Sequence, residues 1–320
     1  MNIVALAGGA GGAKLAHGLA QIMLPDQLTV VVNTGDDFEH LGLHISPDLD
    51  TVMYTLAGLA NAETGWGLAG ETWNFLDALD RLGGETWFRL GDRDLAAHVE
   101  RSRRLWAGES LTDVTASLCA ALGVGPRILP MTDDILRTMV VTEDEGELEF
   151  QEYFVHRRCE PRVTGFRFDG LKSAFPTEAV LAALDAADAI LFCPSNPFVS
   201  LDPVLSLPGV RDRVKRLGAM AVSPIVGGQA LKGPAAKMFA ELGWEVTAAS
   251  VAAHYAGLLR GFVLDEVDAE LKTNIESDTL KVLVTNTIMR TDADRARLAR
   301  EVLDFTSRIT QHVTHDTPSE

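Results

Sequence analysis

The sequence contains little cysteine and no long hydrophobic run. Cys119, Cys159 and Cys193 are its only cysteines, and they are widely spaced with no CxxC pair. We therefore expect neither a disulfide framework nor a zinc site, and a reducing cytoplasm fits this composition. No apolar stretch approaches the ~18–20 residues that a membrane-spanning helix needs. No basic segment precedes the first apolar residues, so we expect no signal peptide.

Positive charge is also scarce, and this limits the possible partners. The 320 residues include 28 lysines and arginines against 45 aspartates and glutamates, for a formal net charge of −17. Nucleic acids and anionic membranes need a basic surface, so neither is expected as the main partner. An acidic protein that binds an anion must do so locally, through backbone N–H groups, a few basic side chains or a bridging cation.

The chain opens with a strand–loop–helix–strand pattern. Residues 3–7 form a short apolar run ended by glycines, which is typical of a buried parallel strand. Residues 13–23 repeat leucine and isoleucine at helical spacing, and residues 29–32 form a second β-branched run. The pattern predicts an α/β fold with a Rossmann-like, largely parallel sheet. It returns later, where we expect helices at 177–188, 210–217 and 235–242 and strands at 189–193, 220–222 and 245–248.

The middle of the chain has a different pattern. Its first part looks mainly helical, whereas residues 136–155 alternate around Glu145 and Gly146, which indicates a β-hairpin. We predict that residues 53–175 are an inserted, mostly helical cap that contains this hairpin and forms a substrate-binding region. The α/β core would then comprise residues 1–52 and 176–308, and residues 309–320 would be a flexible tail.

A glycine loop at residues 8–12 lies between the first strand and the first helix. Backbone N–H groups and the helix dipole at such a place attract phosphate, although a tight turn without a ligand fits as well. No Ser or Thr follows Lys14, so the loop is not a Walker A motif, and the third glycine of GxGxxG would fall on Lys14. Lys14 could either add positive charge to the site or remain solvated.

Polar residues follow the second strand, where ligands of open α/β sheets bind. Asn33, Asp36 and Asp37 lie in this segment. Three interpretations remain open for it. The segment could be an Asx-rich turn, its acid could hold a ribose hydroxyl, or its adjacent carboxylates could bind Mg²⁺, a hard cation that prefers oxygen ligands.

Further polar segments have both a structural and a functional interpretation. Asp48 and Asp50 would share a face in an extended stretch and add to a metal site, whereas in a helix start Asp50 or Ser46 would be the N-cap. Arg89 lies in a polar cluster that could be a helix start or an anion-binding loop. There is no HxH, HExxH or GxSxG motif, which argues against zinc catalysis and a Ser-His-Asp triad.

Several long segments together resemble one family. They are GGAGGAKLAHGL, VVNTGDDFEHLGLHISPDLDTVMYTL, GWGLAGETW, LGDRDLAAH, LPMTDD, PSNPFVSLDPVLSLPGV and SPIVGG. Their order is similar to that in the 2-phospho-L-lactate transferases of deazaflavin coenzyme (F-420) biosynthesis, from residue 1 to about residue 290. The resemblance implies transfer of a phospho-organic-acid group from a guanosine-diphospho-linked donor to the ribityl hydroxyl of Fo, an 8-hydroxy-5-deazaflavin. GMP and coenzyme F-420-0 or its dehydro form would be the products, and the donor could carry lactate, enolpyruvate or glycerate.

The resemblance also implies a cofactor and a set of site residues. Mg²⁺ would be held by Asp50 and by Asp36, chosen over its neighbour Asp37, and these two ligands would also orient the Fo hydroxyl. Asp50 and Arg89 match positions that the family uses for Fo. The donor phosphates and nucleotide would contact Gly9, Gly11, Gly12, Lys14, Asn33, Ser195 and Asn196. A cytoplasmic homodimer is expected.

Two alternatives belong to other functional classes. Nucleotide-sugar-binding regulators of the same superfamily are similar over the glycine loop and the acidic end of the second strand but carry no transferase activity. The segments PDLDT and LGDRD favour the transferase, because the regulators need no acceptor site. The third candidate is a Rossmann-type NAD-dependent enzyme, and the broken GxGxxG spacing counts against it.

Overall fold

A seven-stranded sheet in which every pair of neighbours is parallel forms the centre of the fold. The computed structural model describes the backbone of residues 1–315 and the side chains of residues 1–310. In the order β14-β13-β10-β9-β1-β2-β5, the strands are Lys281–Val284, Leu259–Leu264, Ala219–Val222, Ala189–Phe192, Ile3–Ala7, Leu28–Val32 and Arg127–Pro130. The predicted α/β fold with a parallel sheet is therefore confirmed.

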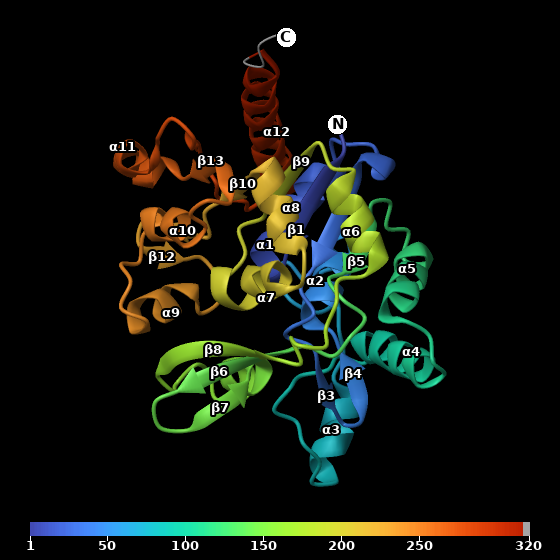
Figure 1. Cartoon of the computed structure of the whole chain (residues 1–320). Coiled ribbons are helices and arrows are strands. Elements are labelled where there is room, and N and C mark those ends of the chain that lie inside the picture. Colours follow the sequence, from blue (N-terminus) through green and yellow to red (C-terminus); the bar gives the residue numbers. More distant parts are fainter. Residues whose placement is uncertain (316–320) are drawn as a thin grey trace.

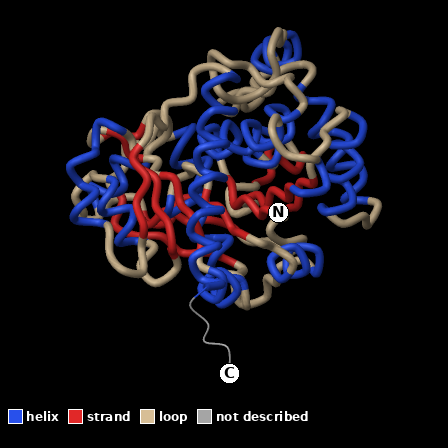
Figure 2. The backbone as a smooth tube through the Cα atoms, turned by 90° about the horizontal axis from the view of Figure 1, so that it is seen from above, coloured by secondary structure: helices blue, strands red, loops and turns tan. Residues whose placement is uncertain are grey.

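Helices cover both faces of this sheet (Figure 2). Along β1, Val4 and Leu6 belong to one hydrophobic core and Ile3 and Ala5 to the other, which explains why the whole strand is apolar. The first core includes residues of α6 (Glu178–Asp185), α8 (Val210–Leu217), α9 (Ala235–Glu241) and α10 (Ala248–His254). The second includes residues of α1 (Gly9–Ala20), α2 (Pro47–Leu56), α5 (Leu111–Ala121) and α12 (Asp292–His315).

The strand order creates a topological switch point between β1 and β9. From β1 the chain adds β2 and then β5 on one side, and it returns to place β9 on the other side of β1. The connections that leave β1 and β9 therefore diverge to opposite faces and leave a crevice between them. Ligands of doubly wound sheets bind in this crevice, beyond the carboxyl ends of the strands.

The cap elements lie beyond those carboxyl ends, opposite the N-terminus (Figure 1). They include β3 (Phe38–His40), β4 (Leu43–Ile45), α3 (Asn74–Arg81) and α4 (Asp94–Trp106). The predicted hairpin is confirmed as β6 (Arg137–Thr142) and β7 (Gly146–Glu149), and β8 (Val163–Asp169) adds a third strand. Shorter elements are β11 (Ile225–Val226), β12 (Gln229–Ala230), α7 (Asp202–Ser206), α11 (Lys272–Ile275), the 3-10 helices Pro25–Gln27 and Glu266–Leu271, and the π-helices Glu152–His156 and Pro197–Leu201.

Several boundaries differ from the sequence predictions. The strand expected at 245–248 is wrong, because the Thr247 hydroxyl accepts a hydrogen bond from Ser250 N at 3.1 Å and caps α10 instead. The segment 53–175 supplies β5 to the main sheet as well as cap elements. The tail predicted at 309–320 is helical as far as His315, in α12, and residues 316–320 lie outside the described residues. Within the described chain, no helix combines the length and the apolar character needed to cross a membrane.

Candidate active site

The glycine loop is held by side chains from two distant segments. Helix α1 starts at Gly9, so most of the loop is the first turn of the helix. Gly8 N donates to the Ser195 hydroxyl at 3.0 Å, and Gly9 N donates to Asp48 Oδ1 at 2.7 Å. The loops after β1 and β9 thus meet at the switch point.

Two glycines allow the start of α1 to approach the loop after β9. A Cβ atom on Gly11 would lie 2.3 Å from the Pro194 carbonyl oxygen, and one on Gly12 would lie 2.5 Å from Ser195 Oγ. A larger residue at Gly11 would displace the Pro194 backbone, and one at Gly12 would displace the Ser195 side chain. The first turn of a helix also carries N–H groups without intrahelical acceptors and the positive end of the dipole, which together bind anions such as phosphate.

Positive charge gathers beside this helix start in an otherwise acidic chain. The pKa of half-buried Lys14 is lowered by burial and by the positive charges of Lys232 and Arg295. Lys232 comes from the segment before α9, and its Nζ donates to the Thr64 carbonyl oxygen at 3.1 Å. This local cationic group suits a phosphorylated ligand.

Three buried carboxylates lie at the carboxyl end of β2 and the start of α2. Asn33 Nδ2 donates to Asp48 Oδ2 at 3.0 Å and to the Val199 carbonyl oxygen at 3.2 Å. Burial and the negative charge of Asp37 raise the pKa of Asp48 to about 6. Burial and the negative charge of Asp48 raise the pKa of Asp36 well above its usual value. Such upward shifts mark a site that lacks compensating positive charge.

The donor set of this acidic cluster fits Mg²⁺. Asp36 Oδ1 and Asp37 Oδ1 are buried and have no hydrogen-bond partner in the described part of the chain. The other oxygen of Asp37 accepts from the Ser46 hydroxyl at 2.7 Å and lies 3.0 Å from His44 Nε2. Unpaired buried carboxylate oxygens are costly, and carboxylate oxygens are the ligands that Mg²⁺ prefers.

Asp50 has different partners from Asp48, because the extended stretch in which the two residues would share a face is not formed. Both residues lie in α2 rather than in an extended stretch. Two residues in an α-helix are separated by about 200° around the axis. Asp48 contacts the glycine loop, whereas Asp50 pairs with the buried guanidinium of Arg101 on α4 through both oxygens, with Arg101 Nη1 at 3.0 Å from Oδ2.

Asp50 belongs to a second buried polar group. One ligand atom each from Asp50, Asp94 and His98 lies within 4.8 Å of the others. The Arg101 guanidinium is bonded to Asp50 and lies 3.4 Å from His98 Nδ1, and Asp94 Oδ1 accepts from the Tyr54 hydroxyl at 2.7 Å. Because the Arg101 guanidinium already pairs with Asp50 and lies beside His98, we interpret this group as an ion-pair network.

The remaining predicted site residues are distributed over several surroundings. Arg89 is exposed, with its guanidinium carbon 4.0 Å from the centroid of the Trp73 ring. Asn196 caps the π-helix Pro197–Leu201, where its Oδ1 accepts from Phe198 N at 3.0 Å. Sequence reasoning missed the contact of Asp48 with the glycine loop. Pro47 could have indicated this contact, because proline favours the first turn of a helix. In a helix, Asp48 and Asp50 lie on different sides of the axis.

A cavity adjoins the acidic cluster. Its volume is about 160 Å³, and it is lined by Thr34, Asp37, His44, Leu105, Leu111, Asp133, Asp134, Ile135 and Arg137. Asp37 is common to the cavity and the cluster. A small-molecule group placed there would therefore lie against the carboxylates.

The parallel sheet, the glycine-rich helix start with its neighbouring cations and the buried carboxylates are typical of an α/β protein that binds phosphorylated ligands at a topological switch point. The particular family follows from comparison with known proteins. This chain belongs to the family described as 2-phospho-L-lactate transferase CofD, which matches residues 3–308. It is therefore a transferase of that family.

Individual relatives are similar along nearly the whole chain. A phosphoenolpyruvate transferase of Streptomyces griseus is 43% identical over 317 residues, covering 97% of this chain and 99% of the relative. A 2-phospho-L-lactate transferase of Methanothermobacter thermautotrophicus is 39% identical, covering 94% and 97%. A crystal structure of a UPF0052 family member from Bacillus halodurans shares the fold with a TM-score of 0.60, at 13% identity and with 94% and 98% coverage. These relatives give the regulator alternative no support.

Proposed function

We propose that the protein transfers a phospho-organic-acid group from a guanosine-diphospho-linked donor to the ribityl hydroxyl of Fo, with release of GMP. The observation that carries the proposal is the contact between Gly9 and Asp48, which joins a phosphate-binding helix start to a buried acidic cluster. Phosphoryl transfer needs both features in one place, because positioning and neutralisation of charge supply most of its catalysis.

The chain's own residues would divide the work as follows. The first turn of α1 and Lys14 would bind the donor phosphates. Asp50 and Arg89 would bind Fo. The Asp36 and Asp37 carboxylates, which each have an unpaired buried oxygen among the described residues, would hold Mg²⁺, with Asp48 adding negative charge beside them. The ion would supply positive charge to the transferring phosphoryl group. Asp50 is not proposed as a ligand here, because Arg101 bonds to both of its oxygens.

We further propose that the donor carries enolpyruvate. Five relatives between 41% and 45% identical are named phosphoenolpyruvate transferases. Three relatives between 36% and 39% identical are named 2-phospho-L-lactate transferases. The consistently higher identity to the first group supports this choice. The homodimer and the cytoplasmic location stay predictions. Light scattering tests the oligomeric state.

A competition experiment tests the donor. The purified protein is incubated with Fo, Mg²⁺ and equal concentrations of the enolpyruvyl and lactyl guanosine diphosphate donors, and the products are resolved by mass. We expect the dehydro form of F-420-0 to dominate. Dominance of F-420-0 would overturn the donor choice but keep the transferase, whereas the absence of both products would contradict the proposed function itself.

A further inference from the structure

The cavity beside the acidic cluster is small. Its volume is about 160 Å³, which is the liquid volume of about five water molecules. Pockets that enclose a whole cofactor are larger, at about 300–1,000 Å³. A short substituent of a substrate therefore fits the cavity, whereas a nucleoside or a tricyclic ring system does not. Asp50 and Arg89, which are proposed to bind Fo, are not among the described residues that line it.

Two buried polar atoms beside the cavity have no partner. Thr34 is 3% exposed, and its hydroxyl oxygen has no hydrogen-bond partner among the described residues. The same is true of Asp37 Oδ1, and both residues line the cavity. A buried polar group without a partner is destabilising. The metal proposed for Asp37 would supply a partner for its oxygen, and a ligand in the cavity would supply one for the Thr34 hydroxyl.

Arg137 brings a positive charge to the cavity. Its guanidinium donates to the carbonyl oxygen of the preceding residue at 3.1 Å, and it forms no ion pair in the described part of the chain. Asp133 also lines the cavity, but its Oδ1 accepts from Thr112 N at 2.7 Å. Asp134 likewise accepts from Phe175 N at 2.9 Å. Both acids are exposed, so water and salt screen their charges. The Arg137 guanidinium is therefore available to an anion.

The backbone fixes Arg137 next to the acidic cluster. Arg137 is the first residue of β6, and N–H of the next residue, Thr138, donates to the Gly35 carbonyl oxygen at 2.7 Å. A Cβ atom on Gly35 would lie 2.6 Å from Thr138 Oγ1, so the two segments are in close contact. Gly35 lies between Thr34 and Asp36. A cation placed on a strand in this way is positioned more precisely than one on a loop.

The position of the cavity matches the chemistry of the donor. In the proposed reaction, the phosphoryl group that moves carries the organic acid through one ester oxygen, so the acid must lie directly beside that group. The metal ligands Asp36 and Asp37 would hold the charge of the same group, and Asp37 borders the cavity. The start of α1, proposed to bind the donor phosphates, joins the cluster through the hydrogen bond from Gly9 to Asp48.

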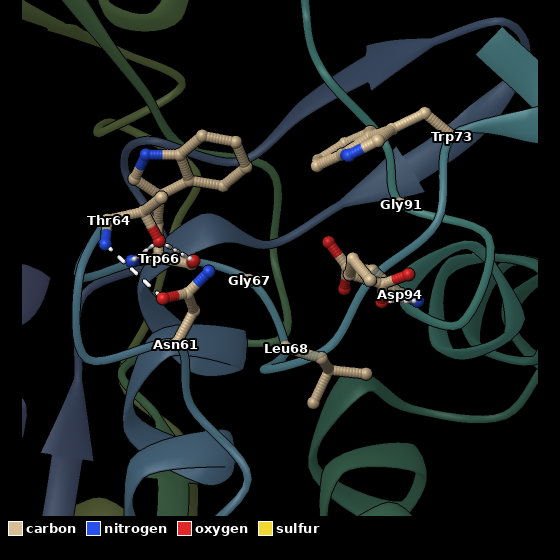
Figure 3. Close-up of a pocket in the computed structure, with 9 residues that line it drawn as sticks. Asn61, Thr64, Trp66, Gly67, Leu68, Trp73, Gly91 and Asp94 are labelled. Atoms are coloured by element: carbon tan, nitrogen blue, oxygen red, sulfur yellow. Dashed lines mark hydrogen bonds between the residues drawn. The ribbon is translucent and has the colours of Figure 1, made fainter. Parts of the chain in front are cut away.

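Another cavity, in the cap, does not fit the acid. Its volume is about 20 Å³, which is room for about one water molecule. Figure 3 shows the Trp66 and Trp73 side chains along one edge of this cavity and Asn61, Leu68 and Asp94 along the opposite edge. The acidic cluster is not part of its described lining. A group placed there would not contact the metal ligands.

We propose that the cavity beside the acidic cluster binds the organic-acid end of the donor. The inference rests on the proposed function, because it takes a guanosine-diphospho-linked acid as the donor. Arg137 pairs with the carboxylate of the acid, and the Thr34 hydroxyl donates a hydrogen bond to it. Leu105 and Leu111, which also line the cavity, contact its carbon chain. Arg137 and Thr34 then determine that the donor carries an acid.

Binding of two nucleotides to the full-length protein tests this inference. One is the enolpyruvyl guanosine diphosphate donor, and the other is guanosine diphosphate, which lacks the acid. Their Kd values are measured by calorimetry with Mg²⁺ and without Fo, for the wild type, Arg137→Met and Thr34→Val. Arg127→Met is the control, because Arg127 is exposed at the amino end of β5, away from the carboxyl ends of the strands.

The variants should weaken binding of the donor alone. Loss of a hydrogen bond to a charged group corresponds to an increase in Kd of between about 10-fold and about 150-fold, and we expect an increase in this range for the donor with Arg137→Met. Thr34→Val should give a smaller increase, and Arg137→Lys should recover part of the affinity. The Kd of guanosine diphosphate should stay within about 2-fold of the wild type in each variant, as should both values for Arg127→Met.

Two results would overturn the assignment of the cavity to the acid. One is an equal rise in Kd for both nucleotides in Arg137→Met and in Thr34→Val. The other is an unchanged donor Kd together with weaker Fo binding, which would assign the cavity to the acceptor. Thr34→Val has nearly the shape of the wild type, so it decides the question if Arg137→Met does not fold.

The outcomes for the cavity and for the proposed function are distinguishable. If the wild type forms product, and Arg137→Met and Thr34→Val distinguish the donor from guanosine diphosphate as well as Arg127→Met does, the cavity inference is wrong and the function stands. If the wild type forms no product from Fo with either the enolpyruvyl or the lactyl donor, the function and the cavity inference both fail.

Discussion

Removal of the Asp36 charge should stabilise the ligand-free protein and abolish its activity. Asp36 is buried, and its Oδ1 lacks a hydrogen-bond partner among the described residues. The negative charge of Asp48 adds to the effect of burial, and both raise the pKa of Asp36. The Asp36→Asn variant has nearly the same shape without the charge. A residue retained at such a cost is expected at a functional site.

The magnitude follows from the pKa shifts in the cluster. The pKa of Asp48 rises from 3.8 to about 6, and about two pH units correspond to about 3 kcal/mol of folding free energy at neutral pH. Asp36 is shifted in the same direction, so its neutral replacement should stabilise the fold at neutral pH. A carboxyl group whose folded pKa is raised stabilises the fold below its unfolded pKa, and this contribution is lost as the pH rises.

Urea unfolding without divalent cations at about pH 5 and about pH 8 measures this effect. The stability difference between Asp36→Asn and the wild type should be small at the lower pH and larger at the higher pH. Added Mg²⁺ should stabilise the wild type more than the variant. Asp26→Asn, which removes an exposed carboxylate, is the control and should change little. A variant that is less stable than the wild type, or a difference independent of pH, would refute the reasoning.

Three further variants test other parts of the site. Arg101→Met leaves Asp50 buried without its partner and should lower the free energy of unfolding by about 3–5 kcal/mol. Urea unfolding should show a smaller loss for Arg101→Lys, which keeps the positive charge. A Met variant as stable as the wild type would contradict the ion-pair interpretation. Gly11→Ala should destabilise the fold and impair activity. Gly165→Ala should do neither, because its Cβ would have no atom of the described residues within 4 Å. Equal melting temperatures for the two variants would contradict the close approach of α1 to the loop after β9. Lys14→Gln should raise the donor KM about 10-fold or more without changing the acceptor KM, and steady-state kinetics that show no change would remove Lys14 from the donor site.

The elements that the sequence predicts well are those with strong local patterns. The apolar run of β1, the glycines and the helical spacing of α1 are all encoded within the first 20 residues. Asn33 and Asp36 could be located because they follow a predicted strand directly, and the carboxyl end of a parallel strand borders the ligand crevice. In the structure, Asn33 donates a hydrogen bond to Asp48 at the start of α2.

The features that the sequence does not reveal depend on geometry or on distant contacts. Asp48 and Asp50 separate because the segment is helical, and a two-residue spacing alone does not distinguish a helix from a strand. Arg101 contacts Asp50 from 51 residues away, so no local pattern relates them. The segment 245–248 looks like a strand, but Thr247 starts a helix because its side chain caps α10.

Product stoichiometry is the most direct test of the central claim that the switch point is a phosphoryl-transfer site. GMP and the F-420 product are quantified together after incubation with the enolpyruvyl donor, in the presence and absence of Fo and of Mg²⁺. The account predicts equal amounts of the two products, formed only when both Fo and Mg²⁺ are present and lost in Asp36→Asn. GMP release without Fo, or undiminished product formation by Asp36→Asn, would contradict it.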